Sequence, residues 1–474
     1  MNTDVNTCEE EKVKNQAPSV PELKRWKAGT LTYSMGGLVV LFCWLLMGDF
    51  AWAMKERSVY TVVQLLFKKF GTSDTLNSLF MGSLPSAISL FLGPAISYRS
   101  DRHRGSRGRR IPYLIITTPI ASLAMVGLAF SPMLGRMLHD LFGIYSPGTN
   151  AITITLLGIF WIIFEVGTIA ANAIFGALIN DVVPHQFLGR FYGLFRAFSL
   201  IAGIIFNLWL LGKAEQHYMW IFIGIGFIYG AGFLIMCLKV KEGEYQPVPP
   251  GREKDTPFEG IATYFKECFS NPYYRWVFIA FTISTLSFAP VNLFSVFYAK
   301  SLNISMDDYG RFIAITFVLS LILSWFLGAL ADRFHPLRMC MASLLLYAVG
   351  ALLSGIFIQG RLTFGAALIS HCVISGIFFT STASLGQRLY PKDRFAQFAS
   401  ACGIIVAVAM MIISPVIGKI LDLTNHAYQW TYIMGAIFAI LGLVTTIIVY
   451  RKFLALGGHT HYQPPDTAVQ QSSM

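Results

Sequence analysis

Long apolar stretches alternate with short polar ones along almost the whole chain. A helix needs about 20 consecutive apolar residues to cross a bilayer, and stretches of about that length recur from residue 31 to residue 450. We therefore expect an all-α polytopic membrane protein with twelve transmembrane helices. The predicted spans are 31–54, 75–98, 111–132, 151–179, 191–212, 218–238, 276–299, 312–331, 339–359, 362–387, 395–418 and 428–450.

The longest polar interruption separates six spans from six. It covers residues 239–275 and contains the Pro-rich run 246–251, a composition typical of linkers. Apolar residues at helical spacing within 257–269 fit an amphipathic helix on the membrane surface, and a solvated linker fits equally well. The predicted domains are a cytoplasmic N-terminal segment at 1–30, a six-helix bundle at 31–238, a cytoplasmic central loop at 239–275, a second six-helix bundle at 276–450 and a cytoplasmic tail at 451–474.

Composition excludes most soluble functions. Of the 474 residues, 55% are hydrophobic and 13% are charged, against roughly 45–50% and 25% in soluble domains. The spans leave no room for a large catalytic domain, and the ionisable residues within them are scattered. The seven cysteines include no Cys-x-x-Cys pair, so neither a zinc site nor a disulfide framework is implied. We expect no enzyme, with no catalytic residues, no metal and no cofactor.

The formal net charge of +11 is explained by topology. With a cytoplasmic N-terminus, 25 of the 36 Lys and Arg residues fall in cytoplasmic segments and 10 in external ones, while Arg196 lies inside a span. This excess supports cytoplasmic placement of both termini by the positive-inside rule. We expect a multi-pass protein of the cell (inner) membrane with the lipid bilayer as a partner, and no nucleic-acid partner, because topology accounts for the basic charge.

One loop pattern occurs at the same place in each half. Ser100-Asp101-Arg102 and then Gly108-Arg109-Arg110 stand between the second and third spans, and Asp332-Arg333 stands between the eighth and ninth. The two loops resemble the signature of the major facilitator superfamily and its weaker second copy. That resemblance implies two six-helix pseudo-repeats that move a small solute by alternating access.

The carboxylates of these loops suit a gate, because a helix N-terminus carries a partial positive charge. The resemblance implies that Asp101 contacts the start of span 11, and Asp332 the start of span 5, when the cytoplasmic side is closed. The alternative is ordinary positive-inside charge. The predicted gating residues are Asp101, Arg102, Arg109, Arg190, Asp332 and Arg333.

Ionisable residues within spans are costly and are therefore candidate functional groups. In span 4, Trp161, Glu165 and Asn172 share one helix face, and span 5 carries Arg196 and Asn207 on a similar polar face. We expect both faces to line one cavity, with Glu165 and Arg196 as its central pair. The alternatives are an Arg196 that reaches the membrane interface and a Glu165 that makes a structural bond between helices.

Three further polar residues lie within other spans. Asp49 in span 1 belongs either to the cavity or to a hydrated external mouth, because Lys55 and Arg57 follow it closely. Asn292 lies in span 7, which is too rich in hydroxyl groups for lipid contact alone. For His371 in span 10, a packed and hydrogen-bonded role is the favoured interpretation.

Within the superfamily, Ser100-Asp101-Arg102 continuing to Gly108-Arg109-Arg110-Ile111-Pro112 most resembles the glycoside-pentoside-hexuronide:cation symporters and the related sucrose transporters. This resemblance implies a sugar or glycoside cargo contacted by an acid on helix 4, an Arg on helix 5 and an acid on helix 1. The corresponding residues are Glu165, Arg196 and Asp49. Melibiose-type symporters carry acids within helix 2 for their cation, whereas residues 75–98 contain none, which favours proton over sodium coupling.

The sequence thus predicts a secondary transporter of a sugar or glycoside, coupled to a proton. Its partners are the small-molecule substrate, the co-transported proton and the bilayer. The alternatives are a carrier of a non-sugar solute (peptide, muropeptide, organic anion or drug) and an uncoupled facilitator. The predicted substrate-binding residues are Asp49, Trp161, Glu165, Asn172, Arg196, Asn207 and Asn292, with Glu165 and Asp49 as proton-coupling groups.

Overall fold

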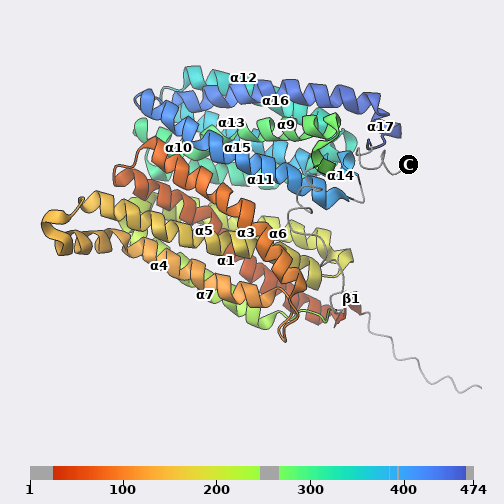
Figure 1. The fold of residues 1–474 in the computed structure, drawn as a ribbon, viewed down its shortest axis with the longest axis horizontal. Helices are drawn as coiled ribbons and strands as arrows, with labels where there is room; N and C mark the ends of the chain where they lie inside the picture. The colour runs from red at the N-terminus through yellow and green to blue at the C-terminus, as the bar shows by residue number, and fades with distance from the viewer. Residues whose placement is uncertain (1–24, 246–265, 384, 392–393, 466–474) are drawn as a thin grey trace, which may run out of the picture.

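The computed structural model describes residues 25–245, 266–383, 385–391 and 394–465, with only the backbone described for 324–333, 396 and 460. Almost all of this chain is helical (Figure 1). An antiparallel hairpin of β1 (Trp26–Ala28) and β2 (Leu31–Tyr33) comes first, and it turns at Gly29, whose φ of 57° suits glycine. The predicted amphipathic segment at 257–269 falls mostly outside the described residues.

The helices alternate in direction through the molecule, and their bounds follow the apolar runs. In the first half they are α1 (Met35–Lys69), α2 (Asp74–Ser78), η1 (Leu79–Ser83), α3 (Leu84–Arg102), α4 (Ile111–Phe142), η2 (Gly143–Tyr145), α5 (Thr149–Val182), α6 (His185–Ile205), η3 (Phe206–Leu210), η4 (Leu211–Lys213) and α7 (Ala214–Lys239). In the second half they are α9 (Pro272–Leu286), α10 (Ala289–Ser301), α11 (Met306–Arg333), α12 (Pro336–Phe357), α13 (Arg361–Thr382), α14 (Leu385–Leu389), α15 (Phe395–Leu423), α16 (Gln429–Ala455) and α17 (Gly458–His461).

Ten helical runs of the described chain are long and apolar enough to cross a membrane. The longest, His185–Lys239, has 55 residues, about 80 Å at 1.5 Å per residue, which is far more than the roughly 30 Å of a hydrocarbon core. It therefore holds two crossings, α6 and α7. With α11, whose 28 residues are also long enough, twelve crossings result, and the predicted all-α polytopic fold is confirmed.

The prediction for the first span was wrong at its C-terminal end. The sequence interpretation stopped that span at residue 54, because Lys55, Glu56 and Arg57 are costly in lipid. In the structure α1 continues to Lys69 and buries Lys55 completely inside the bundle. Three charges that seemed to mark an external mouth therefore lie at the middle of a 35-residue helix.

The helices of each half pack mainly on one another. In the first half α4 packs against α5 and α7, and α1 against α6 and α7; in the second half α12 packs against α13 and α16. Contacts between the halves run from α15 to α2 and α3, and from α11 to α6, η3 and η4. We call the end that holds β1 and α17 the terminal end, and the opposite one the distal end (Figure 1).

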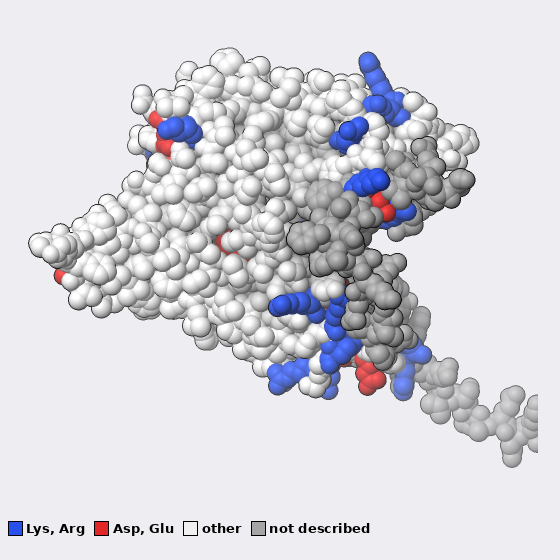
Figure 2. All heavy atoms as spheres, in the orientation of Figure 1, with Lys and Arg blue, Asp and Glu red and all other residues white. Residues whose placement is uncertain are grey.

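Glycines allow the halves to touch closely at the distal end. A Cβ added at Gly310 would overlap the carbonyl oxygen of Asn207, one at Gly82 would overlap Ser414, and one at Gly418 would overlap the backbone of Asp74. We call these three contacts the distal seam. On the face drawn in Figure 2, Lys and Arg gather at the terminal end of both halves, and the surface between the two ends is almost entirely uncharged, with one small acidic patch near its centre.

Candidate functional site

A cavity of about 530 Å³ lies between the two halves. Its volume falls within the range of roughly 300–1,000 Å³ typical of small-molecule sites. The walls come from α1, α6, η3, α10, α11 and α13. The polar lining consists of Glu56, Arg57, Tyr60, Thr61, Arg196, Asn207, Asn292, Ser295, Tyr309, Thr316, Ser320, His371 and Ser375. Three predicted binding residues, Arg196, Asn207 and Asn292, therefore line one cavity.

Three charged side chains line this cavity: Glu56, Arg57 and Arg196. Glu56 and Arg196 are exposed to it, and the buried Nε of Arg57 has no hydrogen-bond partner. The Arg57 guanidinium lies 5.1 Å from the ring centre of Phe317. Within the described part of the chain, none of the three forms an ion pair. Unpaired charges inside a membrane are costly, so the cavity suits a ligand that hydrogen-bonds to them. Sequence reasoning missed Glu56 and Arg57 because it ended the span before them.

His371 is packed and hydrogen-bonded at the wall of the cavity. Its Nδ1 lies 2.8 Å from the Tyr347 hydroxyl, and its Nε2 lies 3.0 Å from Oδ1 of Asn292. A hydroxyl donor at Nδ1 leaves the proton on Nε2, which donates to Asn292. The ring thus fixes the Asn292 amide so that its NH₂ group remains available to a ligand.

Glu165 is not paired with Arg196. The cation beside it is Lys55 of α1. Lys55 is completely buried; its Nζ lies 3.5 Å from the ring centre of Trp52 and donates to Oγ1 of Thr168 at 3.3 Å. Glu165 is 9% exposed and close enough to interact electrostatically with Lys55. The lining of the cavity does not include Glu165. Of the two polar faces predicted on spans 4 and 5, the one with Glu165 therefore lies beside Lys55, and the one with Arg196 lines the cavity.

The remaining predicted binding residues lie outside the cavity lining. Trp161 is fully buried, and its Nε1 donates to the carbonyl of Phe80 at 2.9 Å, so its ring packs inside the first half and not against the cavity. Asn172 is exposed and is not part of the lining. Asp49 is 1% exposed, and neither carboxylate oxygen has a hydrogen-bond partner in the described part of the chain.

The predicted gating residues of the first half form a cluster within that half. Arg110 lies 2.5 Å from Asp101 and 3.3 Å from Asp181, and Arg109 lies 2.6 Å from Asp181. Arg102 stacks 3.8 Å from the ring centre of Tyr98. The contact expected between Asp101 and span 11 is absent from this described arrangement, and it stays a prediction for a state closed at the terminal end.

The other three predicted gating residues make no contact that tests the prediction in the described part of the chain. Arg190 is exposed, and the side chains of Asp332 and Arg333 lie outside the described part of the chain.

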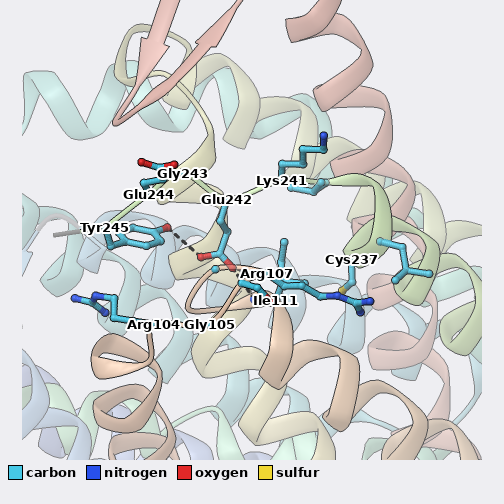
Figure 3. A pocket seen from close by; sticks show the side chains of 14 residues that line it. Arg104, Gly105, Arg107, Ile111, Cys237, Lys241, Glu242, Gly243, Glu244 and Tyr245 are labelled. Carbon is cyan, nitrogen blue, oxygen red and sulfur yellow. Dashed lines mark hydrogen bonds between the residues drawn. The ribbon is translucent and has the colours of Figure 1, made fainter. Parts of the chain in front are cut away.

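Glu242 caps the N-terminus of α4 from a distant part of the sequence. Its carboxylate accepts the backbone N–H groups of Arg109, Arg110 and Ile111 at 2.9, 2.8 and 2.6 Å. The Tyr245 hydroxyl donates to Glu242 at 3.0 Å (Figure 3). Burial raises the pKa of Tyr245 well above its ordinary value, and the negative charge of Glu242 raises it further. The hydroxyl therefore remains a donor. The only sequence signal for this cap is indirect, because Arg110 before α4 supplies no capping side chain.

At the distal end, Asp422 of α15 joins the halves by capping α2. Its carboxylate accepts the backbone N–H groups of Asp74 and Thr75, each at 2.9 Å, and the Thr75 hydroxyl at 2.5 Å. A second bridge between the halves connects Lys300 to Glu215 at 2.6 Å. Both contacts close the cavity at the distal end in this state.

Asp74 extends the same network. Its fully buried carboxylate lies 2.9 Å from Nζ of Lys68, 2.6 Å from Nδ1 of His426 and 3.1 Å from the Tyr428 hydroxyl. Ligand atoms of Asp74, Asp422 and His426 lie within 4.8 Å of one another, a spacing that suits a metal ion. Both carboxylates are already engaged by protein donors, so we assign them to closure. Asp74, Asp422, Lys68, Thr75, His426 and Tyr428 together are called the distal lock.

Comparison with known proteins identifies the fold. The sequence model of the Major Facilitator Superfamily matches residues 45–412 and 277–464. A bacterial homologue of the human lysosomal transporter Spinster, inward-facing and unoccupied, superposes with a TM-score of 0.61 at 14% identity, over 90% of this chain and 98% of that one. A D-xylose–proton symporter gives 0.60 at 14% identity, over 91% and 98%, and the nucleoside transporter NupG gives 0.58 at 11%, over 87% and 99%. No curated protein matches the sequence.

Proposed function

Because this chain belongs to the major facilitator superfamily and is a multi-pass membrane transporter rather than an enzyme, we propose that it carries a sugar or glycoside, coupled to a proton, by alternating access. The cavity of about 530 Å³ between the halves carries this proposal. Its amides, hydroxyls and phenols suit a cargo rich in hydroxyl groups, each of which both donates and accepts. The likeness to a D-xylose–proton symporter supports the same class.

The terminal end is the cytoplasmic end in this proposal. The excess of Lys and Arg in the loops on that side supports the placement by the positive-inside rule. Because the distal lock joins the halves at the opposite end, this arrangement faces the cytoplasm in the proposal. The two predicted bundles, 31–238 and 276–450, would rock about the cavity to expose it to the other side.

Cargo hydroxyls would be held from both halves. Arg57 and Arg196 supply guanidinium donors from the first half, Glu56 an acceptor, and the Asn292 amide, fixed by His371, reaches in from the second half. A ligand that contacts both halves favours the arrangement in which they are correctly spaced, since a ligand shifts a conformational equilibrium only by its differential affinity.

Proton coupling is assigned to Glu165 and its buried neighbour Lys55, with Asp49 as a second carboxyl. Gain or loss of a proton at Glu165 changes the charge of this pair by one in a place where an unbalanced charge is strongly disfavoured. The pair lies beside α1, the helix that also carries Glu56 and Arg57 into the cavity. Movement of α1 therefore links protonation to cargo binding.

The unpaired guanidinium groups favour one second candidate, an organic anion. Two arginines and one glutamate leave the cavity with an excess positive charge, which a carboxylate on the cargo would balance. The peptide, muropeptide and drug alternatives have no such observation in their favour.

Two experiments test these assignments. Neutral sugars, glycosides and their carboxylate analogues are compared for thermal stabilisation of the purified protein, because a ligand of the folded state raises its stability by mass action. The best ligand is then assayed in proteoliposomes under an imposed pH or sodium gradient. We expect a pH gradient to drive accumulation. A sodium requirement would refute proton coupling, and stabilisation by carboxylate analogues alone would favour the organic anion.

The coupling residue is tested with Glu165→Gln. This variant should retain binding and counterflow exchange but lose accumulation driven by the pH gradient, because the amide cannot release a proton. Asp140→Asn, on the exposed distal part of α4, is the matched control and should transport like the parent. If Glu165→Gln accumulates the ligand normally, Glu165 is structural.

A further inference from the structure

A second and larger cavity lies at the terminal end, away from the cavity between the halves. It encloses about 740 Å³ between the loop at 104–108, the ends of α4 and α7, and the segment at 240–245 that follows α7 (Figure 3). It shares no lining residue with the cavity between the halves. The transport proposal gives this cavity no role.

One wall of this cavity is apolar and meets the lipid-facing edge of the first half. Ile111 of α4 and Cys237 and Leu238 of α7 form that wall, and α4 packs beside α7. Leu238 is 57% exposed, and Phe227 further along α7 is 74% exposed. Large exposed apolar side chains on a membrane helix face acyl chains. The cavity therefore begins where these two helices leave the hydrocarbon region.

The cationic groups stand next to that apolar wall. Arg107 and Lys241 are exposed, and neither forms an ion pair within the part of the chain that the structure describes. In Figure 3 both lie on the Cys237 side of the cavity, whereas Glu244 lies toward Tyr245.

One of the two acidic residues that line this cavity already has hydrogen-bond donors. The Glu242 carboxylate accepts three backbone N–H groups at the start of α4 and the hydroxyl of Tyr245. Its negative charge is largely balanced by the partial positive charge of the α4 N-terminus. The side of the cavity that holds Arg107 and Lys241 is therefore electropositive.

We propose that this cavity binds one anionic phospholipid from the leaflet at the terminal end. The phosphate lies between Arg107 and Lys241, and the acyl chains follow the exposed apolar faces of α4 and α7. A soluble phosphate would use the cations but not the apolar wall. Basic pockets of this kind between transmembrane helices suit anionic headgroups. The bound lipid rests against the loop that also carries Arg109 and Arg110, so it stabilises the cluster around Asp181.

The test measures lipid binding to the full-length protein in detergent micelles by native mass spectrometry. Phosphatidylglycerol and phosphatidylcholine with the same acyl chains are the probes. Each Lys or Arg near an anionic headgroup contributes about fivefold in binding, so two contribute about 30-fold. We expect phosphatidylglycerol to bind about 30-fold more tightly than phosphatidylcholine, and Arg107→Gln/Lys241→Gln to remove that difference.

The matched control is Arg136→Gln/Lys213→Gln, which removes two exposed cations at the distal end and should leave the preference intact. If the first double variant does not fold, the single variants Arg107→Gln and Lys241→Gln should each lose about fivefold. Equal binding of the two lipids by the parent protein would overturn the proposal. So would an unchanged preference in the Arg107 and Lys241 variants, or competition by inorganic phosphate as strong as that by the lipid.

Discussion

Replacement of Asp422 by Ala should open the distal end. Asp422 belongs to α15 in the second half, and its carboxylate accepts two backbone N–H groups and one hydroxyl at the start of α2 in the first half. In the alternating access that we propose, α2 and α15 separate when the cavity opens distally. The contacts therefore stabilise only the present state, and their loss shifts the equilibrium toward the other one.

The size of the shift follows from the geometry. Hydrogen bonds to a charged group contribute about 1.5–3 kcal/mol each, but loss of a helix-capping side chain costs only about 0.5–2 kcal/mol in total, because water replaces it. The Asp422 side chain is 20% exposed, so screening by water also applies. We take about 2 kcal/mol, which corresponds to about a 30-fold change in the ratio of the two states.

The assay is a distance measurement between spin labels at Tyr145 and Leu362 in a background without the seven native cysteines. These side chains are 87% and 82% exposed and lie at distal helix ends of opposite halves. In Asp422→Ala the ratio of long to short distances should rise about 30-fold. Asp308→Ala is the control, because Asp308 pairs at 2.7 Å with Arg361 inside the second half. An unchanged distribution in Asp422→Ala, or an equal shift in the control, would refute the reasoning.

Two further predictions concern the distal seam and the α4 cap. Gly310→Ala places a Cβ against the Asn207 carbonyl, which destabilises the distally closed state by about 1–3 kcal/mol and should shift the same distances toward the distally open state. Gly224 has open space around it, so Gly224→Ala should leave the distances unchanged. An unchanged distribution in Gly310→Ala would contradict the role of the distal seam in closure. Glu242→Gln weakens the cap on three backbone N–H groups and should lower the free energy of unfolding by about 1–2 kcal/mol. Thermal melting checks this against Glu244→Gln, and equal midpoints contradict the cap.

The sequence determines the spans well because lipid imposes a simple rule on them. A run of apolar residues of sufficient length predicts a crossing wherever the helix packs, and that is why the twelve predicted spans correspond to helices. Arg196, Asn207 and Asn292 were predicted as site residues for a related reason, since polar groups inside such runs must face an interior surface. The same rule fails for Lys55, Glu56 and Arg57, because a cluster of three charges ends an apolar run although tertiary packing shelters it.

Long-range partners were beyond sequence reasoning. The helix face that carries Trp161 and Glu165 was identified from spacing, but the rotation of α5 within the bundle was not, and Trp161 packs against Phe80 instead of the cavity. Glu242 caps residues about 130 positions away, and Asp422 caps residues about 350 positions away. Both caps depend on where helices end in space, which no local pattern encodes.

The distal seam also bears on the response of transport to temperature. Its contacts leave no room for water at the glycines, so distal opening hydrates surfaces that were dry, while closure at the terminal end dries others. Exposure of apolar surface raises the heat capacity, and exposure of polar surface lowers it. Unless the two ends balance, the enthalpy difference between the states changes with temperature. A turnover rate limited by this conversion would then follow a curved Arrhenius plot, with no single activation energy.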